Sequence, residues 1–408
     1  MPRGTNLPAI GDFNQTVVLD AIRRSDIGMS RAALVEKTGL ASQTITNVSK
    51  RLLADGLVRE AGKNITGPGR PRVILELAPE GRFAVGVHLD PAFITYAVID
   101  MRGRIVAHMR TRTPKIARPD EVLSTIVDSI ESIMRAPGIS RDRVLGIGIA
   151  SPGPIDAERG IVLDPPLLEG WRDVPLRASV QEATGLPVLL EKDVNASVVA
   201  ELWSGGDDFH ENFAFFYLGT GIGIGLALAG EVFRGSSGNA GEGGTLYVPV
   251  KDLADGRNVD MLGRLATPGY LVREAVDAGI LKPDTTAHDP ESIERSFNEL
   301  LRRAEAGDTQ TTTLLDRAAD AVGVALVSLV NLLDVDRIIF GGPYWASLAP
   351  RFEPRIALML KGSTDRTTHH PVDLSESSMG DDVAAVGAAC LVLDDALSPR
   401  PTSLLIGT

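Results

Sequence analysis

The chain has 408 residues, of which 44% are apolar and 23% charged, and its net charge at pH 7 is −12. This composition is that of a globular protein, and the length predicts two or three domains. The sequence has no apolar run of about 18 residues and no signal-peptide-like segment at its start, which argues against a membrane span and favours the cytoplasm. The single cysteine, Cys390, excludes an internal disulfide and any metal site built from several cysteines.

The charge is distributed unevenly along the chain. Residues 1–78 contain 11 basic and 7 acidic side chains, whereas residues 79–408 contain 30 basic and 46 acidic ones. A basic segment in front of a strongly acidic body indicates that only the front end approaches a polyanion. We therefore expect residues 1–78 and 79–408 to form separate domains.

The front end has the pattern of three short helices. Apolar residues recur at helical spacing over 15–24, and Ser30 and Gly39 mark the start and the end of a second helix over 31–37. The third helix is expected to begin with Ser42 as its N-cap and to stop at Gly56. Two helices joined by a tight turn containing glycine are typical of a helix-turn-helix, whose second helix enters the major groove of DNA.

The third helix leaves a polar face beside its apolar stripe of Ile45, Val48, Leu52 and Leu53. Short hydrogen-bonding side chains near its start suit base edges, and the cations that follow suit phosphates. The candidate DNA-binding residues of this helix are Ser42, Gln43, Thr44, Thr46, Asn47, Lys50 and Arg51.

Two expected strands, 57–60 and 73–77, follow the third helix as a β-wing. The loop between them, GKNITGPGRPR, holds Arg70 and Arg72 among glycines and prolines, and arginine in such a loop fits a narrow minor groove. The alternative is a small helical docking domain whose polar face is merely solvated. The helix, the wing and the charge asymmetry agree with one another, and they favour DNA binding.

From Arg82 onward the pattern alternates between strands and helices, which predicts an α/β body in two lobes with ligands at the strand ends. Strands are expected over 83–90, 94–111, 143–153, 187–195, 213–233 and 337–342, and helices over 119–136, 196–205, 311–333 and 384–397. The segment 213–233 reads as two strands with a turn at Gly230-Glu231. It contains LGTGIGIG, a glycine ladder whose period of two fits the turn end of a hairpin and neither common nucleotide-binding glycine pattern.

Six short segments of this body resemble, in order and spacing, the ROK family of repressors, open reading frames and sugar kinases. They are SPGPID (151–156), EKDVNASVVAE (191–201), LGTGIGIG (218–225), NAGEGGT (239–245), IIFGG (338–342) and AVGAA (385–389). Each segment is weak alone, but together with the wing they carry the resemblance over about residues 12–395. The resemblance implies a winged helix-turn-helix followed by an actin-like, two-lobed body.

The resemblance also implies where a sugar would bind. Asp193 matches the carboxylate with which the family's kinases activate the sugar hydroxyl, and Glu242 matches a glutamate that contacts the sugar. The place of Asp193 in a strand-to-helix loop independently favours ligand contact. The alternative is that Asp193 only caps the helix expected to begin at Asn195.

The stretch VGVHLDPAFI departs from the family's first phosphate-binding turn, which has a DxGxT-like pattern. His88 stands in place of the aspartate, and Pro91 and Ala92 replace the glycine and its hydroxyl-bearing neighbour. Proline lacks an N–H donor, and the Cβ atoms block close approach of a phosphate to the backbone. ATP binding and kinase activity are therefore not expected.

The family's zinc ligands are also replaced. In the matching register Thr245 stands in place of the histidine, and Gly263, Leu265, Tyr270 and Val272 stand in place of the three cysteines and a glutamate. A tetrahedral zinc site of three cysteines and one histidine is not available. No metal or other cofactor is expected, and Thr245 joins the candidate ligand-binding residues.

Lys192 stands where relatives usually have asparagine. One alternative is a surface lysine, or an internal ion pair with Glu191 or Asp193. The other is that Lys192 faces the pocket and meets an anionic or otherwise modified sugar, whose hydroxyls donate to Asp193 and Glu242. Neutral monosaccharides stay open at this point.

These features predict a sequence-specific regulator, a repressor of carbohydrate genes, controlled by a sugar or sugar derivative in a catalytically inactive kinase-like body. Its expected partners are a double-stranded DNA operator and a second copy of the chain, as a homodimer or homotetramer. A ROK-type sugar kinase carrying a DNA-binding domain is the main alternative. A ligand-blind architectural regulator is a third.

Overall fold

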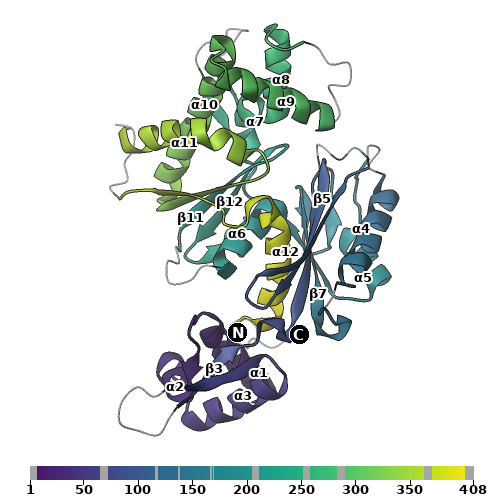
Figure 1. The fold of residues 1–408 in the computed structure, drawn as a ribbon, viewed down its shortest axis with the longest axis vertical. Helices are drawn as coiled ribbons and strands as arrows, with labels where there is room; N and C mark the ends of the chain where they lie inside the picture. The colour runs from purple at the N-terminus through teal and green to yellow at the C-terminus, as the bar shows by residue number, and fades with distance from the viewer. Residues whose placement is uncertain are drawn as a thin grey trace.

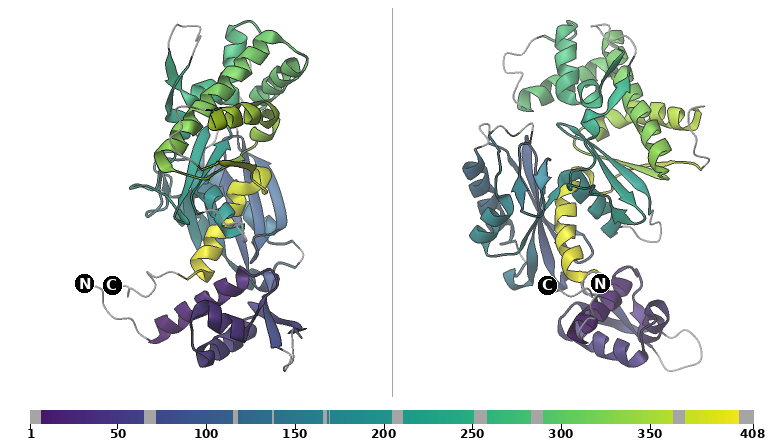
Figure 2. Two further views of the ribbon diagram at one scale, coloured as in Figure 1. Left: turned by 90° about the vertical axis from the view of Figure 1, so that its left-hand side faces the viewer. Right: turned by 180° about the vertical axis from the view of Figure 1, so that it is seen from behind.

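The structure is a computed structural model, and it describes residues 7–64, 72–114, 118–136, 138–165, 168, 170–204, 211–250, 258–282, 290–362 and 370–399. A small helical domain with a β-wing lies at one end of an elongated molecule (Figure 1). Two α/β lobes follow, and the turned views show the same order (Figure 2). Within the described residues no helix is both long and apolar enough to cross a membrane.

The small domain is a winged helix-turn-helix. Its elements are α1 (Leu7–Arg23), β1 (Met29–Ser30), α2 (Arg31–Thr38), α3 (Ser42–Ala54), β2 (Val58–Asn64) and β3 (Arg72–Leu77). Strands β2 and β3 pair antiparallel as the wing, and β1 adds to the free edge of β3. The apolar stripe of α3 is buried against α1 and α2, which leaves the opposite face of α3 at the surface.

The ends of the two central helices show which sequence signals were read correctly. The Ser30 side chain accepts a hydrogen bond from the Ala33 N–H, and Gly39 ends α2 in the left-handed conformation with φ of 70°, as expected. The expected N-cap Ser42 is wrong. Ala41 is the N-cap of α3 and makes no side-chain cap, because Ser42 already lies inside the first turn, where its carbonyl accepts from Thr46 Oγ1.

The first lobe contains a five-stranded sheet with the order β10-β7-β4-β5-β6. Its strands are β4 (Phe83–Leu89), β5 (Phe93–Asp100), β6 (Ile105–Arg112), β7 (Val144–Ser151) and β10 (Val188–Lys192). Strands β4, β5 and β6 form an antiparallel meander. Strand β7 pairs parallel with β4, and β10 pairs parallel with β7. Helices α4 (Pro119–Ile133) and α5 (Leu176–Thr184) lie on one face, and the C-terminal helix α12 (Val383–Leu397) lies on the other (Figure 1).

The second lobe contains another five-stranded sheet, in the order β13-β12-β11-β16-β17. Its strands are β11 (Phe213–Leu218), β12 (Ile222–Leu228), β13 (Glu231–Val232), β16 (Arg337–Gly341) and β17 (Asp373–Glu376). Every residue of β11 is buried, because alternate side chains face two different layers. Phe213, Phe215 and Tyr217 join the core with α12, whereas the residues between them join the core of the outer helices.

The outer layer of the second lobe is mostly helical. It comprises α7 (Leu262–Ala266), α8 (Pro268–Asp277), α9 (Pro290–Glu305), α10 (Thr309–Leu333) and α11 (Trp345–Gly362), with a small hairpin of β14 (Tyr247–Pro249) and β15 (Val259–Met261). The expected single turn at Gly230-Glu231 is wrong. The stretch 213–233 forms three strands, with one turn at Gly219–Gly221 and another at Ala229–Gly230, where both residues have positive φ.

Helix α6 (Asp193–Ser204) connects the two sheets, and with α12 it lies between the lobes (Figure 1). The two helices cross closely at Gly387, where an added Cβ would lie 1.8 Å from the Ala196 carbonyl oxygen. Two lobes with sheets of mixed strand direction confirm the expected α/β body. The position of α6 matters for function because one of its ends lies in the main cavity.

Candidate functional site

A cavity of about 390 Å³ lies between the lobes, where loops from both sheets converge. Part of its polar lining comes from the ends of β4 and β10, the β11–β12 turn and the segment before β14, as Asp90, Lys192, Asp193, Thr220, Glu242 and Thr245. Tyr217 at the end of β11 and Arg264, Thr267 and Tyr270 at α7 and α8 complete it. The structure thus brings all four sequence-predicted ligand residues, Lys192, Asp193, Glu242 and Thr245, into one cavity. Loops that follow strands of an open α/β sheet are the usual place for a ligand.

Lys192 is the last residue of β10, and it is only 3% exposed. Its Nζ lies 2.5 Å from Oε1 of Glu242 and donates to the carbonyl oxygens of Ala240 at 3.0 Å and Asn239 at 3.3 Å. An ammonium group has three donors, and this arrangement engages all three. The expectation of a surface lysine is therefore wrong, because the loop 239–242 folds over the ammonium group. The alternative of an internal ion pair is right in kind, but the partner is Glu242 in place of Glu191 or Asp193.

The neighbours of Lys192 hold the same loop. Oε1 of buried Glu191 accepts from Nδ2 of Asn195 at 3.0 Å, and Oε2 accepts from Nε of Arg234 at 2.6 Å. Asn239 bonds to both the N–H and the carbonyl of Ile155 in the first lobe, at 2.7 and 2.8 Å. The loop 234–242 is thus tied to the β10–α6 junction and across the cleft.

Asp193 is the first residue of α6, so the helix begins two residues before the expected start at Asn195. Its Oδ1 accepts a hydrogen bond from the Val194 N–H at 2.7 Å, and its side chain also lines the cavity. Burial, with smaller contributions from the Glu242 and Asp90 carboxylates, raises the pKa of Asp193 from 3.8 to about 7 against the opposing effect of Lys192. The helix-end role and the cavity-lining role therefore coexist.

Glu242 and Thr245 line the cavity from the segment that precedes β14. The Glu242 side chain is 54% exposed, so its second oxygen is accessible from the cavity. The Thr245 hydroxyl donates to the Glu242 carbonyl at 2.8 Å and fixes this turn. Carboxylates held in such a polar cavity accept hydrogen bonds from the hydroxyls of a polyol.

Sequence reasoning missed Asp90 as a site residue. Its Oδ1 accepts from the Ala92 N–H at 2.8 Å, and its Oδ2 lies 3.4 Å from Thr220 Oγ1 in the β11–β12 turn of the other lobe. Burial raises the pKa of this carboxyl. The signal was present in the sequence, since Asp90 directly precedes Pro91 in the turn where the family's kinases have glycine.

His88 is buried in β4 and does not line the cavity. Its ring packs edge-on against Tyr217 with centroids 6.1 Å apart. Burial, with a contribution from Arg110, lowers the pKa of His88 to about 4, so the imidazole is neutral at physiological pH. His88 is thus a core residue beneath the site.

The glycine ladder positions α6 against the second sheet. An added Cβ on Gly223 would lie 2.2 Å from Cγ1 of Val194, and one on Gly225 would lie 2.5 Å from the Val194 carbonyl oxygen. Gly221, in contrast, faces open space and lines the cavity. Gly223 and Gly225 therefore let the hairpin approach the helix that begins with Asp193.

The positions that the resemblance assigns to zinc ligands do not fit zinc. Leu265 and Val272 are buried apolar side chains, Gly263 packs against Gly244, and none of these three residues carries a metal donor. Across the described ranges no group of three or more histidine, cysteine or acidic side chains is arranged to hold a metal ion.

Helix α3, which carries the candidate DNA-binding face, lies in the domain at the end of the molecule farthest from the second lobe (Figure 1). Ser42, Gln43, Asn47, Lys50 and Arg51 are exposed or partly exposed there, as are Thr44 and Thr46. Nε2 of Gln43 donates to Oδ1 of Asn47 at 3.3 Å, which aligns two amide side chains along this face. Arg70 lies outside the described residues, and of Arg72 only the backbone, in β3, is described.

Comparisons with known proteins agree with this architecture. A model described as the ROK family matches residues 84–395. The xylose repressor of Bacillus subtilis strain 168 is 26% identical over 389 residues, covering 93% of this chain and 95% of the repressor. The solved structure of a ROK family transcriptional regulator, a homolog of the E. coli MLC protein, is 24% identical, with a TM-score of 0.73 over 95% of this chain and 98% of that one.

A kinase is also similar. The ROK hexokinase from Thermus thermophilus is 31% identical, with a TM-score of 0.58 over 77% of this chain and 99% of the hexokinase. The regulator and the repressor thus align along nearly the whole chain, whereas the hexokinase aligns with about three quarters of it. The expected actin-like, two-lobed body behind a winged helix is confirmed.

Proposed function

The chain belongs to the ROK family, and from this premise we propose that it is a DNA-binding transcriptional repressor controlled by a sugar bound in its kinase-like body. One observation carries the proposal. A winged helix with an exposed polar recognition face is joined to a body whose cavity presents Asp193 and Glu242, while Asp90 and Pro91 occupy the turn where a kinase would hold phosphate. The similarity to a xylose repressor along nearly the whole chain supports this assignment.

The DNA-binding function is assigned to residues 1–78 and the ligand-sensing function to residues 79–408. On α3, the amides Gln43 and Asn47 would read base edges, and Lys50 and Arg51 would hold phosphates. Ser42, Thr44 and Thr46 complete this face, and Arg70 and Arg72 are assigned to the wing contact. Helix-turn-helix proteins bind two-fold operators as dimers, so we propose a homodimer or homotetramer in solution.

The effector that this cavity suits best is a sugar without negative charge. Lys192 is satisfied by Glu242 and two carbonyl groups, so it has no free donor for an anion. Arg264, the other cation of the described lining, lies 3.6 Å from the buried carboxylate of Asp260. Asp90 and Asp193 also line the cavity, and burial outweighs the effect of Lys192 on Asp193, so an anionic ligand would meet two carboxyl groups at short range.

In this arrangement Asp193, Glu242 and Thr245 would contact the hydroxyls of the sugar, and Lys192 would hold the Glu242 carboxylate in position. The idea that Lys192 binds an anionic sugar is not favoured, because the ammonium group is already enclosed. Binding of the sugar between the lobes would favour a closed cleft and shift the population of orientations of the winged helices.

We propose that the body is not catalytic. Phosphoryl transfer from ATP requires that the enzyme cradle the phosphates with donors and metal. Here the carboxyl group of Asp90 projects toward Thr220 of the glycine ladder, and Pro91 offers no N–H, so the two turns that would bracket a nucleotide present a carboxyl group where donors are needed.

A sugar kinase is the second candidate because Asp193 is present. Burial raises the pKa of Asp193 to about 7, a value suited to a general base. A coupled assay with ATP and a panel of sugars tests this candidate. Phosphorylation with appreciable turnover would replace the repressor proposal with a kinase that carries a DNA-binding domain.

The experiment that tests the proposal is a thermal-shift screen of matched sugars, followed by operator binding. D-xylose, D-glucose and D-glucosamine are compared with D-glucuronate and glucose 6-phosphate. An uncharged or amino sugar should raise Tm and change operator affinity, whereas its acidic or phosphorylated counterpart should not. Operator binding that no sugar alters would indicate a ligand-blind regulator, and stabilisation by the anionic sugars would refute the assignment of effector charge.

A further inference from the structure

The two ends of α6 lie at two different places of functional interest. Asp193, its first residue, lines the cavity, and Trp203, in its last turn, lies against the DNA-binding domain. Between them the helix is buried from Val194 to Ala200, packed against β12 on one side and α12 on the other (Figure 1). A helix packed along its length moves as a rigid unit, because displacing it requires the neighbouring core to move.

Arg23, the last residue of α1, joins the DNA-binding domain to this end of α6. Its guanidinium carbon lies 4.0 Å from the centroid of the Trp203 ring, and its Nη1 donates to the Trp203 carbonyl at 3.0 Å. Asp20 on the same helix holds the guanidinium group through Nε at 3.2 Å and Nη2 at 2.7 Å. The Arg23 side chain is 10% exposed, so these contacts are largely shielded from water.

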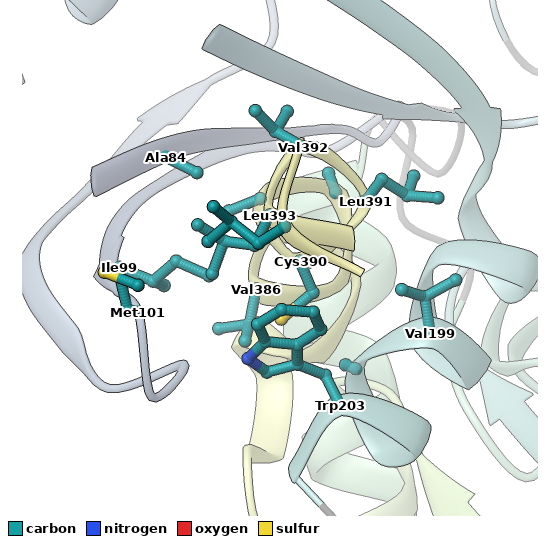
Figure 3. Close-up of a cluster of buried hydrophobic side chains, with 14 of the residues drawn as sticks. Ala84, Ile99, Met101, Val199, Trp203, Val386, Cys390, Leu391, Val392 and Leu393 are labelled. Carbon is teal, nitrogen blue, oxygen red and sulfur yellow. The ribbon is translucent and has the colours of Figure 1, made fainter. Parts of the chain in front are cut away.

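Arg23 suits the C-terminal end of α6 because this end carries free carbonyl groups and a partial negative charge. The carbonyl groups of the last turn of a helix have no partners within the helix, and the helix dipole favours a cation there. Arg23 supplies both the donor and the charge, and its planar group stacks on the indole ring as well. The Trp203 ring also lies beside Cys390 and Val386 of α12 (Figure 3), so it is part of the core that α6 shares with α12.

The DNA-binding domain has a second attachment, to the first lobe. Strand β3 continues through residues 79–81 into β4, and the Met101 N–H donates to the Pro79 carbonyl at 3.0 Å. Nη1 of Arg143 also donates to the Glu80 carbonyl at 3.0 Å. The domain is therefore attached to the first lobe at residues 79–81 and, through α1, to the end of α6 and to α12 beside it.

We propose that the Arg23–Trp203 contact is the joint through which occupancy of the cavity changes the orientation of the DNA-binding domain. When a ligand on Asp193 closes the cleft, α6 moves relative to the first sheet, and Trp203 carries Arg23 and α1 with it. The domain then rotates about its attachment at residues 79–81. This inference rests on the proposed function, since it concerns how the effector site regulates DNA binding.

The test compares the full chain with Arg23→Ala and with the milder Arg23→Lys, which keeps the charge and loses the planar stack. Effector affinity is measured by calorimetry, and operator affinity by fluorescence anisotropy with and without saturating sugar, using the first of D-xylose, D-glucose and D-glucosamine that stabilises the wild type. In R23A the effector affinity should stay within about threefold of the wild type. The ratio of operator affinities with and without sugar should fall toward one. In R23K this ratio should be intermediate.

Gln15→Ala is the matched control, because Gln15 lies on α1 but donates within the DNA-binding domain, to Asp55. This variant should respond to the sugar as the wild type does. A full response in both Arg23 variants would overturn the proposed joint and leave the repressor function intact. If no sugar of the panel changes operator binding by the wild type, the sugar-responsive function itself fails, and the joint fails with it.

Discussion

The ammonium nitrogen of Lys192 and Oε1 of Glu242 lie 2.5 Å apart, joining residues 50 positions apart in the sequence. Lys192 is buried at the end of β10, while Glu242 reaches it from a loop of the second lobe's sheet and is half exposed. The pair fixes one carboxylate in the lining of the cavity that Asp193 also lines. It also explains why a lysine in this cavity is compatible with a neutral ligand.

Replacing Lys192 should reduce both stability and effector binding. In Lys192→Met the Ala240 carbonyl and one oxygen of Glu242 lose a charged donor, which should lower the free energy of unfolding by about 1–3 kcal/mol. Glu242→Gln should cost under about 1 kcal/mol, because this carboxylate is half exposed. Urea unfolding of the two single variants and the double variant measures the coupling energy between the two side chains. Additive effects on the free energy of unfolding would show that Lys192 and Glu242 do not stabilise each other.

At pH 8, where the Asp193 carboxylate is ionised, Asp193→Asn should weaken effector binding about ten- to a hundredfold, since a charged acceptor is lost. Burial raises the pKa of Asp193 from 3.8 to about 7, so the native state holds this proton more tightly than the unfolded chain does. The stabilising effect of the protonated form is full below pH 4 and is lost as the pH rises to 7. The stability of D193N relative to the wild type should therefore increase by at least about 1 kcal/mol between pH 5 and pH 8.

Thermal unfolding of both proteins at the two pH values measures this difference. The amide oxygen introduced by D193N can still accept from the Val194 N–H, so the start of α6 should be kept. A stability difference that does not depend on pH would show that Asp193 titrates near its ordinary value.

Two positions of the glycine ladder provide a matched pair. Gly223→Ala should lower stability by about 1–3 kcal/mol, because the new methyl group would lie 2.2 Å from Val194 Cγ1 and displace α6. Gly221→Ala meets no atom within 4 Å, so it should leave Tm nearly unchanged and act only on the cavity. Equal destabilisation by the two substitutions would contradict the close packing of hairpin and helix.

The residues of the DNA-binding face should separate into two classes. Gln43→Ala and Asn47→Ala should relax preference at individual base pairs by about 1–3 kcal/mol each. Lys50→Ala, Arg51→Ala and the wing changes Arg70→Ala and Arg72→Ala should weaken binding to all sequences and flatten its salt dependence. Anisotropy titrations with operator and scrambled DNA at matched salt measure both effects. If neither class changes affinity, the assignment of α3 as the recognition helix is wrong.

Local elements were predictable where the pattern was strong and the ends carried a signal. Ser30 and Gly39 bound α2 as expected, and α10 was found because its apolar spacing continues along the whole helix. Sequence reasoning missed α8 and α9, whose apolar positions acquire a meaning only when the two helices pack together. The turn between β11 and β12 was missed because both faces of β11 are buried. The strand therefore lacks the alternation of apolar and polar residues whose end would have marked the turn.

The sequence by itself determined the family, the order of the two functional parts and the loss of the zinc ligands, because these properties depend on which residues stand at which positions. Only the tertiary structure decided what Lys192 and Asp90 do. Lys192 meets Glu242, and Asp90 meets Thr220 of the other lobe, through contacts between segments far apart in the chain. Burial and partners set the charge and availability of such groups, and these are properties of the folded cavity that spacing along the chain does not encode.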